Sequence, residues 1–190
     1  MWITNGGFAN LFTVFAKIED DENLTAFLVE ADSEGISLNP EEKKMGIKGS
    51  STRQVFFNNV KVPVENMLSE RGNGFKIALN ILNIGRIKLG AAVMGGAKGG
   101  IDESVRYSLE REQFGRSISK YGAIRYKLAE QVIQTYVVES ATYRAGQNID
   151  DAIKGLMEGG MDKAQATLQG IELFAPECAV IKVAGSECLD

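Results

Sequence analysis

Apolar and polar positions alternate along the first third of the chain, as they do in half-buried β-strands. Residues 11–15 and 24–29 are rich in aromatic and β-branched side chains, and the acidic segment 19–23 between them has the composition of a turn. Together they predict a β-hairpin. Further short runs end at glycine, asparagine or proline and predict more strands, at 35–38, 54–57 and 60–62. The pattern therefore predicts an antiparallel β-unit of about five strands.

The hydrophobic period changes at Gly74, where apolar residues begin to recur every three or four positions, as in an amphipathic helix. One long helix is predicted over residues 74–113, a second over 123–149, and a third from Gly160 toward the C-terminal residue. Pro176 lies inside the third pattern and lacks a backbone N–H. We therefore expect this last helix to be kinked or to start late, near Ala175.

A glycine-rich turn at residues 70–74 separates the two patterns and predicts domains at 1–72 and 73–190. The composition, 44% hydrophobic and 24% charged, is typical of a folded soluble protein. A net charge of −4 offers no basic surface for nucleic acid. No continuous apolar run reaches about 18 residues, and residues 1–7 contain no basic segment. We therefore expect no membrane span, no signal peptide and a cytoplasmic location.

The chain contains no histidine. Imidazole-based catalysis and His-ligated metal sites are therefore excluded within it, which leaves carboxylates, lysines, tyrosines or a cofactor to carry out chemistry. Cys178 and Cys188 lie on a predicted helix, where a ten-residue separation corresponds to about 15 Å, too far for a disulfide. We expect free thiols, as in a reducing compartment.

Glycines are unusually frequent in the first predicted helix, although each costs about 1 kcal/mol relative to alanine there. They occupy positions 85, 90, 95, 96, 99 and 100. The cluster at 95–100 is interpreted as a surface for close helix packing; the alternative is a surface kept bare for a ligand or partner. No Gly-x-Gly-x-x-Gly motif follows a strand, so Rossmann and P-loop nucleotide sites are excluded.

Two further features have both a structural and a functional interpretation. Arg86, near Asn83, is suited to clamp a phosphate or carboxylate, or to form a salt bridge. Trp2, the single tryptophan, stands near Thr4 and a Gly-Gly turn; such a pair suits a flat heteroaromatic ligand, but a tryptophan also often fills a core. The charged segment 109–116 is interpreted as a solvated face ending in a helix cap.

Several short motifs occur in a characteristic order: 2–6 (WITNG), 44–52 (KMGIKGSST), 60–63 (VKVP) with 65–66 (EN), 74–76 (GFK) and 110–115 (EREQFG). In this order they resemble the acyl-CoA dehydrogenase family over essentially the whole chain. The segments 78–86 and 136–140 resemble its very-long-chain-like branch. Members have an N-terminal helical domain, a middle β domain and a C-terminal four-helix bundle. The resemblance thus implies an α+β fold, with a partial antiparallel β-barrel-like middle domain followed by part of an antiparallel four-helix bundle.

The resemblance also implies a cofactor, FAD, held between the two domains and across a dimer interface. Its implied contacts are Trp2 against the isoalloxazine ring, Thr4 and the Ile3 backbone at its reactive edge, and Arg111, Gln113 and Phe114 at the diphosphate and adenosine of the neighbouring subunit's FAD. The implied acyl-CoA channel is lined by Asn83, Ile84, Gly85 and Arg86, with Arg86 at the CoA part. Gly122 departs from the shorter-chain members, many of which have a flavin-contacting glutamine there.

Family chemistry is α,β-dehydrogenation of fatty acyl-CoA in β-oxidation, with a glutamate base and reoxidation by an electron-transfer flavoprotein. Most members carry that base in a Glu-Gly-Thr motif that residues 1–190 do not contain; a few carry it immediately before the arginine matched by Arg86, where this chain has Gly85. We therefore expect a fragment of such an enzyme that is inactive by itself and belongs to a homodimer or higher homo-oligomer. The alternatives are an FAD- or CoA-binding or assembly module without turnover, and a structural fragment that self-associates through an uncovered bundle face.

Overall fold

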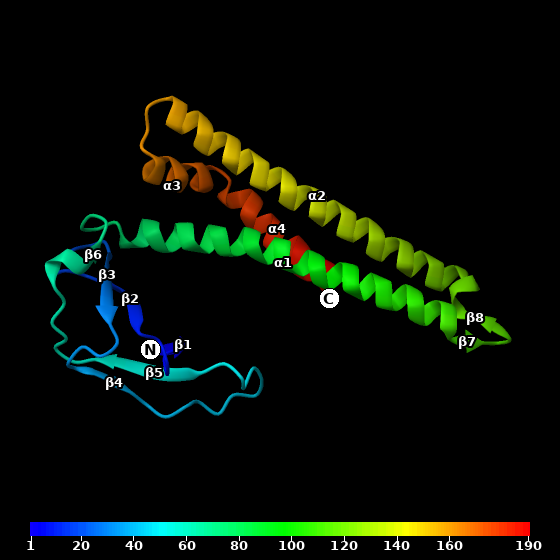
Figure 1. Cartoon of the computed structure of the whole chain (residues 1–190), viewed down its shortest axis with the longest axis horizontal. Helices are drawn as coiled ribbons and strands as arrows, with labels where there is room; N and C mark the ends of the chain where they lie inside the picture. Colours follow the sequence, from blue (N-terminus) through cyan, green and yellow to red (C-terminus); the bar gives the residue numbers. More distant parts are fainter. The chain divides into compact units, whose positions relative to one another are not determined.

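A computed structural model describes all of residues 1–190, which divide into two compact units, Met1–Ala78 and Leu79–Asp190. The first unit contains six strands (Figure 1): β1 (Trp2–Thr4), β2 (Leu11–Ala16), β3 (Thr25–Glu30), β4 (Ile36–Leu38), β5 (Thr52–Phe57) and β6 (Met67–Leu68). A single 3₁₀ turn, Val64–Asn66, precedes β6. Helix α1 (Gly74–Glu110) starts in this unit and continues into the second.

The strands form two three-stranded antiparallel sheets, with the orders β1-β5-β4 and β2-β3-β6, and no closed barrel. The predicted hairpin is confirmed, because β2 and β3 pair along their whole length, with Phe12 opposite Val29. Both side chains are buried, and Phe12 meets Phe57 edge to face at 6.0 Å between ring centroids. Residues paired in register thus contribute to a small apolar core.

One strand prediction is wrong, and one strand was not predicted. Residues 60–62 form no strand, and the chain instead pairs with β3 a little later, through β6. Pro63 has no N–H to offer a ladder, so the segment before it runs unpaired into the 3₁₀ turn. The segment Trp2–Thr4, for which no strand was predicted, pairs with β5 as β1. Three residues are too few to show a period of two.

The second unit is helical. After α1 a two-stranded hairpin, β7 (Glu112–Gln113) and β8 (Arg116–Ser117), and a 3₁₀ turn, Ile118–Lys120, lead into α2 (Gly122–Glu158), α3 (Lys163–Leu173) and α4 (Ala175–Leu189). Helix α2 runs nine residues past the predicted end at Ile149. Asp162 caps α3 by accepting the N–H groups of Ala164 and Gln165, at 2.9 and 3.1 Å.

The predicted third helix is divided at Phe174, and Pro176 lies in the first turn of α4. The expected interruption near Ala175 is therefore confirmed, as a break between two helices. Proline is tolerated there because the first N–H groups of a helix have no partner within the helix. Cys178 and Cys188 both lie on α4 and are unpaired, as expected.

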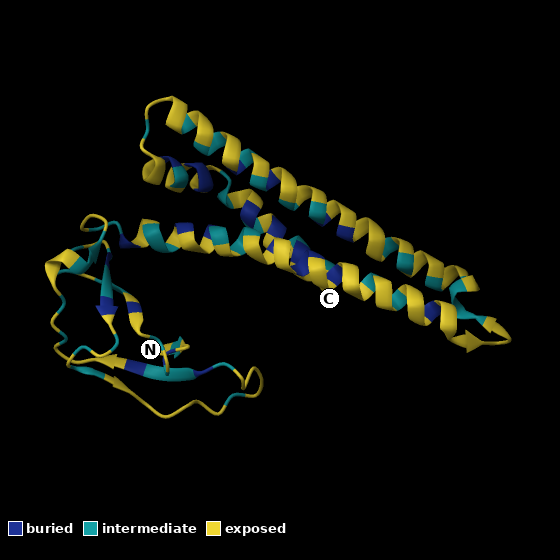
Figure 2. Ribbon diagram, viewed as in Figure 1, coloured by how far each residue is buried: buried dark blue, intermediate teal, exposed yellow.

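Buried residues of the helical unit are dark blue in Figure 2, and two clusters of them form its core. One contains Val93, Met94 and Val138, and the other contains Ile149, Ile171 and Cys178. The cluster around Cys178 desolvates its thiol, and this burial raises the pKa of Cys178.

The interpretation of the glycine cluster 95–100 as a packing surface is wrong for most of its members within this chain. A Cβ added at Gly95, Gly99 or Gly100 would meet nothing within 4 Å, and only Gly96 lies close to Leu189. The close approach occurs one turn earlier, at Gly90, where a Cβ would lie 2.3 Å from Ile181 on α4.

Helix α1 is long and apolar enough to cross a membrane, because an 18-residue window in it reaches a mean hydropathy of 1.4. The expectation of no span rested on continuous apolar runs, which Arg86 and Lys88 interrupt. Core helices of soluble proteins meet the same criterion. Val93 and Met94 of α1 pack against Val138 of α2, which makes α1 part of the helical core of its own unit.

Candidate functional site

Strand β1 presents the three candidate residues of the first unit. Trp2 is 63% exposed, and its indole Nε1 donates a hydrogen bond to Oε1 of Glu42 at 2.8 Å. Ile3 and Thr4 lie opposite Arg53 and Thr52 of β5. The exposure of Trp2 excludes the interpretation as a core residue, and it leaves a fixed aromatic surface open to a flat ligand.

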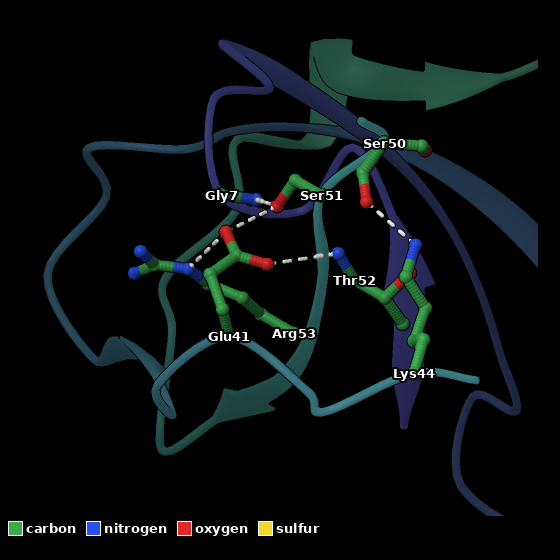
Figure 3. Close-up of polar contacts among 7 residues, drawn as sticks. All are labelled: Gly7, Glu41, Lys44, Ser50, Ser51, Thr52 and Arg53. Atoms are coloured by element: carbon green, nitrogen blue, oxygen red, sulfur yellow. Dashed lines mark hydrogen bonds and ion pairs between the residues drawn. The ribbon is translucent and has the colours of Figure 1, made fainter. Parts of the chain in front are cut away.

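The carboxylate of Glu41 is the centre of a hydrogen-bonded cluster at the start of β5, the strand that pairs with β1 (Figure 3). Oε1 of Glu41 accepts hydrogen bonds from Oγ of Ser51 at 2.7 Å and from Nε of Arg53 at 2.9 Å, while Oε2 accepts the backbone N–H of Thr52 at 3.0 Å. Ser51 Oγ in turn accepts the N–H of Gly7 at 3.2 Å. The Ser51 and Arg53 bonds to the charged form lower the pKa of Glu41 to about 2.

The candidate segment 111–114 lies in the second unit, between α1 and α2. Phe114 and Gly115 form the tip of the β7–β8 hairpin with φ values of 51° and 79°, the positive pair typical of a two-residue hairpin turn. This segment forms a β-hairpin, so the prediction of a helix cap at this position is wrong. The Tyr121 hydroxyl donates to the Gln113 carbonyl at 2.8 Å, and the rings of Phe114 and Tyr121 meet edge to face at 6.5 Å.

Two groups on this hairpin segment remain available to a ligand. The guanidinium of Arg111 makes no ion pair or side-chain hydrogen bond within the chain, and Phe114 is 93% exposed. An unpaired cation and, three residues later, an exposed aromatic ring have the chemistry needed to hold a diphosphate and a planar group.

The third candidate segment, 83–86, lies on α1. Asn83 is 5% exposed, and its Oδ1 accepts a hydrogen bond from Nη1 of Arg86 at 2.9 Å. Ile84 packs against the Ile149–Ile171–Cys178 cluster and lines an apolar cavity of about 290 Å³ within the helical unit. Gly85 is exposed, with nothing within 4 Å of an added Cβ. Arg86 thus forms a hydrogen bond to Asn83. This contact takes the place of the salt bridge considered for Arg86 from the sequence.

Comparison with known proteins decides the family. The model of the acyl-CoA dehydrogenase middle domain matches residues 1–60, and that of the acyl-CoA dehydrogenase C-terminal domain matches residues 72–187. The chain belongs to the acyl-CoA dehydrogenase family. The resemblance inferred from the ordered motifs is confirmed, as is the α+β architecture of a middle β domain followed by helices.

Individual acyl-CoA dehydrogenases match the whole length of this chain. A probable acyl-CoA dehydrogenase of Bacillus subtilis (strain 168) is 41% identical over 189 residues, covering 100% of this chain and 32% of the relative. The human very long-chain specific, mitochondrial acyl-CoA dehydrogenase is 43% identical over 195 residues, covering 98% and 27%.

The crystal structure of an acyl-CoA dehydrogenase from Bacillus anthracis, complexed with FAD, superposes with a TM-score of 0.86 at 46% identity, covering 100% of this chain and 32% of that one. The chain therefore spans about a third of the length of these acyl-CoA dehydrogenases.

Two glutamates of this chain were not predicted from the sequence. Glu42 reaches Trp2 over 40 positions, and Glu41 reaches Ser51 over ten and Arg53 over twelve. Contacts between residues so far apart leave no periodic signal. The only local signal is the pair of carboxylates directly after Pro40, at the start of the lysine-rich segment.

The β-unit of this chain is expected to lose stability in acid through Glu41. Its pKa lies at about 2 in the folded chain, against an ordinary value of 4.5. The carboxylate therefore stabilises the fold fully above pH 4.5, and the contribution is lost as the pH falls through 2. Urea unfolding of Glu41→Gln should show a weaker dependence on pH in this range than the original chain. Glu34→Gln is a control at an exposed carboxylate without a partner, and it should keep the pH dependence of the original chain. Equal pH dependence in the two variants would contradict the assignment of this effect to Glu41.

Proposed function

We propose that this chain supplies the flavin-facing and acyl-CoA-facing parts of an FAD-dependent dehydrogenase that introduces the α,β double bond into fatty acyl-CoA during β-oxidation. The observation that carries the proposal is the match of the two family domains, in family order, to residues 1–60 and 72–187. The similar Bacillus anthracis enzyme is complexed with FAD, and the similar human enzyme is very long-chain specific, which supports the cofactor and the substrate class.

The residues present fit FAD. Trp2 offers an exposed indole held at its nitrogen, suited to pack against an isoalloxazine ring, and Ile3 and Thr4 follow it on the same strand, where their backbone and hydroxyl would meet the reactive edge of that ring. Arg111 offers an unpaired guanidinium to the diphosphate, with Gln113 and Phe114 next to it for the adenosine. When bound, the flavin supplies the acceptor for the hydride that leaves the β-carbon of the substrate.

The chain's own residues bind and orient the acyl-CoA in this proposal. Arg86, already fixed by Asn83, would hold an anionic group of the CoA part. A glutamate base for the α-proton is absent at the position before Arg86, where Gly85 stands. We therefore propose that residues 1–190 by themselves bind without turnover. The same observation favours a second candidate, an FAD- or CoA-binding or assembly module of this family.

The proposed partners follow family behaviour. An electron-transfer flavoprotein would reoxidise the flavin, and a homodimer or higher homo-oligomer would bring the segment 111–114 of one subunit to the FAD of the next. The oligomer is tested by the sedimentation of the chain with and without FAD. A monomer in both conditions would contradict it.

We also propose a cytoplasmic location. The two unpaired cysteines, Cys178 and Cys188, support it, because free thiols persist in a reducing compartment. Cell fractionation with an antibody against the chain tests this proposal, and recovery in a membrane or secreted fraction would contradict it.

The substrate-binding proposal is tested by titrating the chain with palmitoyl-CoA in the presence of FAD. Arg86→Ala should weaken binding about tenfold, since a charge-assisted contact to the CoA is lost. Arg144→Ala removes the same charge from an exposed position of α2 and should leave the affinity unchanged. No binding by the original chain, or equal affinities in all three proteins, would contradict the proposed function.

A further inference from the structure

Glu41 is the centre of a cluster that no sequence motif indicated. One carboxylate accepts hydrogen bonds from three consecutive residues, Ser51, Thr52 and Arg53, at 2.7 to 3.0 Å (Figure 3). Both oxygens are used, and the ion pair with Arg53 adds charge to the hydrogen bonds. A neutral or shorter side chain at this position cannot satisfy all three donors in this geometry.

The three donors are the residues that hold the β1 segment in place. Thr52 lies opposite Thr4 in the sheet, and Arg53 lies opposite Ile3. The carbonyl of Ser51 accepts the N–H of Asn5 at 2.9 Å. Glu41 therefore fixes the stretch of β5 on which the β1 strand and the turn after it are built.

The cluster also reaches the turn directly. Ser51 Oγ donates to Glu41 and accepts the N–H of Gly7, so the carboxylate orients the hydroxyl that holds the turn. A Cβ on Gly7 would lie 2.6 Å from Ser51 Oγ and 2.9 Å from Oε1 of Glu41. Gly7 must lack a side chain for this approach, which gives the second glycine of the Gly6-Gly7 pair a physical reason.

We propose that Glu41 is a positioning residue for the flavin-facing strand: through Ser51, Thr52 and Arg53 it fixes the place of Ile3, Thr4 and the turn at Gly7 before any ligand binds. The proposal rests on the proposed flavin site for its functional half. Its structural half concerns the chain without cofactor. Donors that are already in place bind a ligand more tightly, because no conformational entropy is lost in ordering them when the ligand binds.

The structural half is tested by amide hydrogen exchange, residue by residue, in the flavin-free chain. Glu41→Ala should speed the exchange of the Thr52 and Gly7 amides at least about tenfold, because the first loses its acceptor and the second loses its oriented hydroxyl. Glu41→Gln keeps one acceptor oxygen and should give intermediate rates. It also preserves the comparison if Glu41→Ala fails to fold. The matched control Glu34→Ala should leave both amides unchanged, and unchanged exchange in both Glu41 variants would overturn the proposal.

The functional half is tested on the same variants with FAD. We expect Glu41→Ala to weaken FAD binding about tenfold and to lower the reduction potential of the bound flavin, since less ordered donors stabilise the reduced ring less well. Faster amide exchange with an unchanged affinity and an unchanged potential would overturn the positioning role. If no protein in the set binds FAD, the proposed function fails, while the exchange rates still decide whether Glu41 orders the β1 segment.

Discussion

Replacing Gly35 by alanine is expected to destabilise the β-unit by about 3 kcal/mol. Gly35 ends the turn between β3 and β4 with a φ of 95°, a backbone conformation that side chains with a Cβ rarely adopt. An added Cβ would lie 2.2 Å from the carbonyl oxygen of Asn58. That oxygen cannot move away freely, because the Asn58 N–H bonds to the Gly35 carbonyl at 2.9 Å.

Urea or thermal unfolding of the purified chain measures this effect. For a unit of this size the expected loss corresponds to a fall in Tm of more than about 10 °C. Gly46→Ala is the matched control, since its added Cβ would meet nothing within 4 Å and its φ is not positive. A Gly35→Ala chain that melts together with the Gly46→Ala chain would show that the turn is not built as described.

Reversing the charge of Arg111 is expected to weaken FAD binding at least about 100-fold. The guanidinium has no partner within the chain, so its loss should not disturb the fold. In the proposed site, a glutamate there removes an attraction and places a negative charge beside the diphosphate of FAD. The effect should shrink as the salt concentration rises, because Arg111 is exposed.

FAD titration followed by flavin fluorescence measures this prediction. Arg125→Glu makes the same change of net charge at another exposed arginine and should bind FAD as the original chain does. An equal loss in both variants would show a general effect of charge. An unchanged affinity in Arg111→Glu would remove Arg111 from the site.

Local patterns predicted much of the fold. The alternation in residues 11–15 and 24–29 was sufficient for the hairpin, because the apolar residues Phe12 and Val29 that it marks as inward-facing are paired in register and are both buried. Pro176 correctly indicated where α4 starts, since proline imposes its constraint on the chain locally. The strand predicted at residues 60–62 is absent. Their β-branched composition is typical of a strand, but Pro63 directly after them has no N–H to pair in a ladder.

The site was predicted only through family resemblance. Nothing in the composition of residues 2–4 separates an exposed tryptophan from a buried one; that depends on β5, Glu42 and the sheet register. Gly90 and Gly96 have neighbours on α4, whereas Gly95 has none, and this distinction depends on which face of α1 meets α4. Such facts arise from tertiary packing, which no single segment encodes.

In the proposed function, Trp2–Thr4 face one FAD and the segment 111–114 reaches the FAD of the neighbouring subunit. The most direct measurement is the visible absorption spectrum of the purified 190-residue chain after incubation with FAD and removal of the free cofactor. We expect a retained flavin band that is lost in Arg111→Glu and kept in Arg125→Glu. A chain that stays colourless at FAD concentrations up to about 1 mM would contradict it.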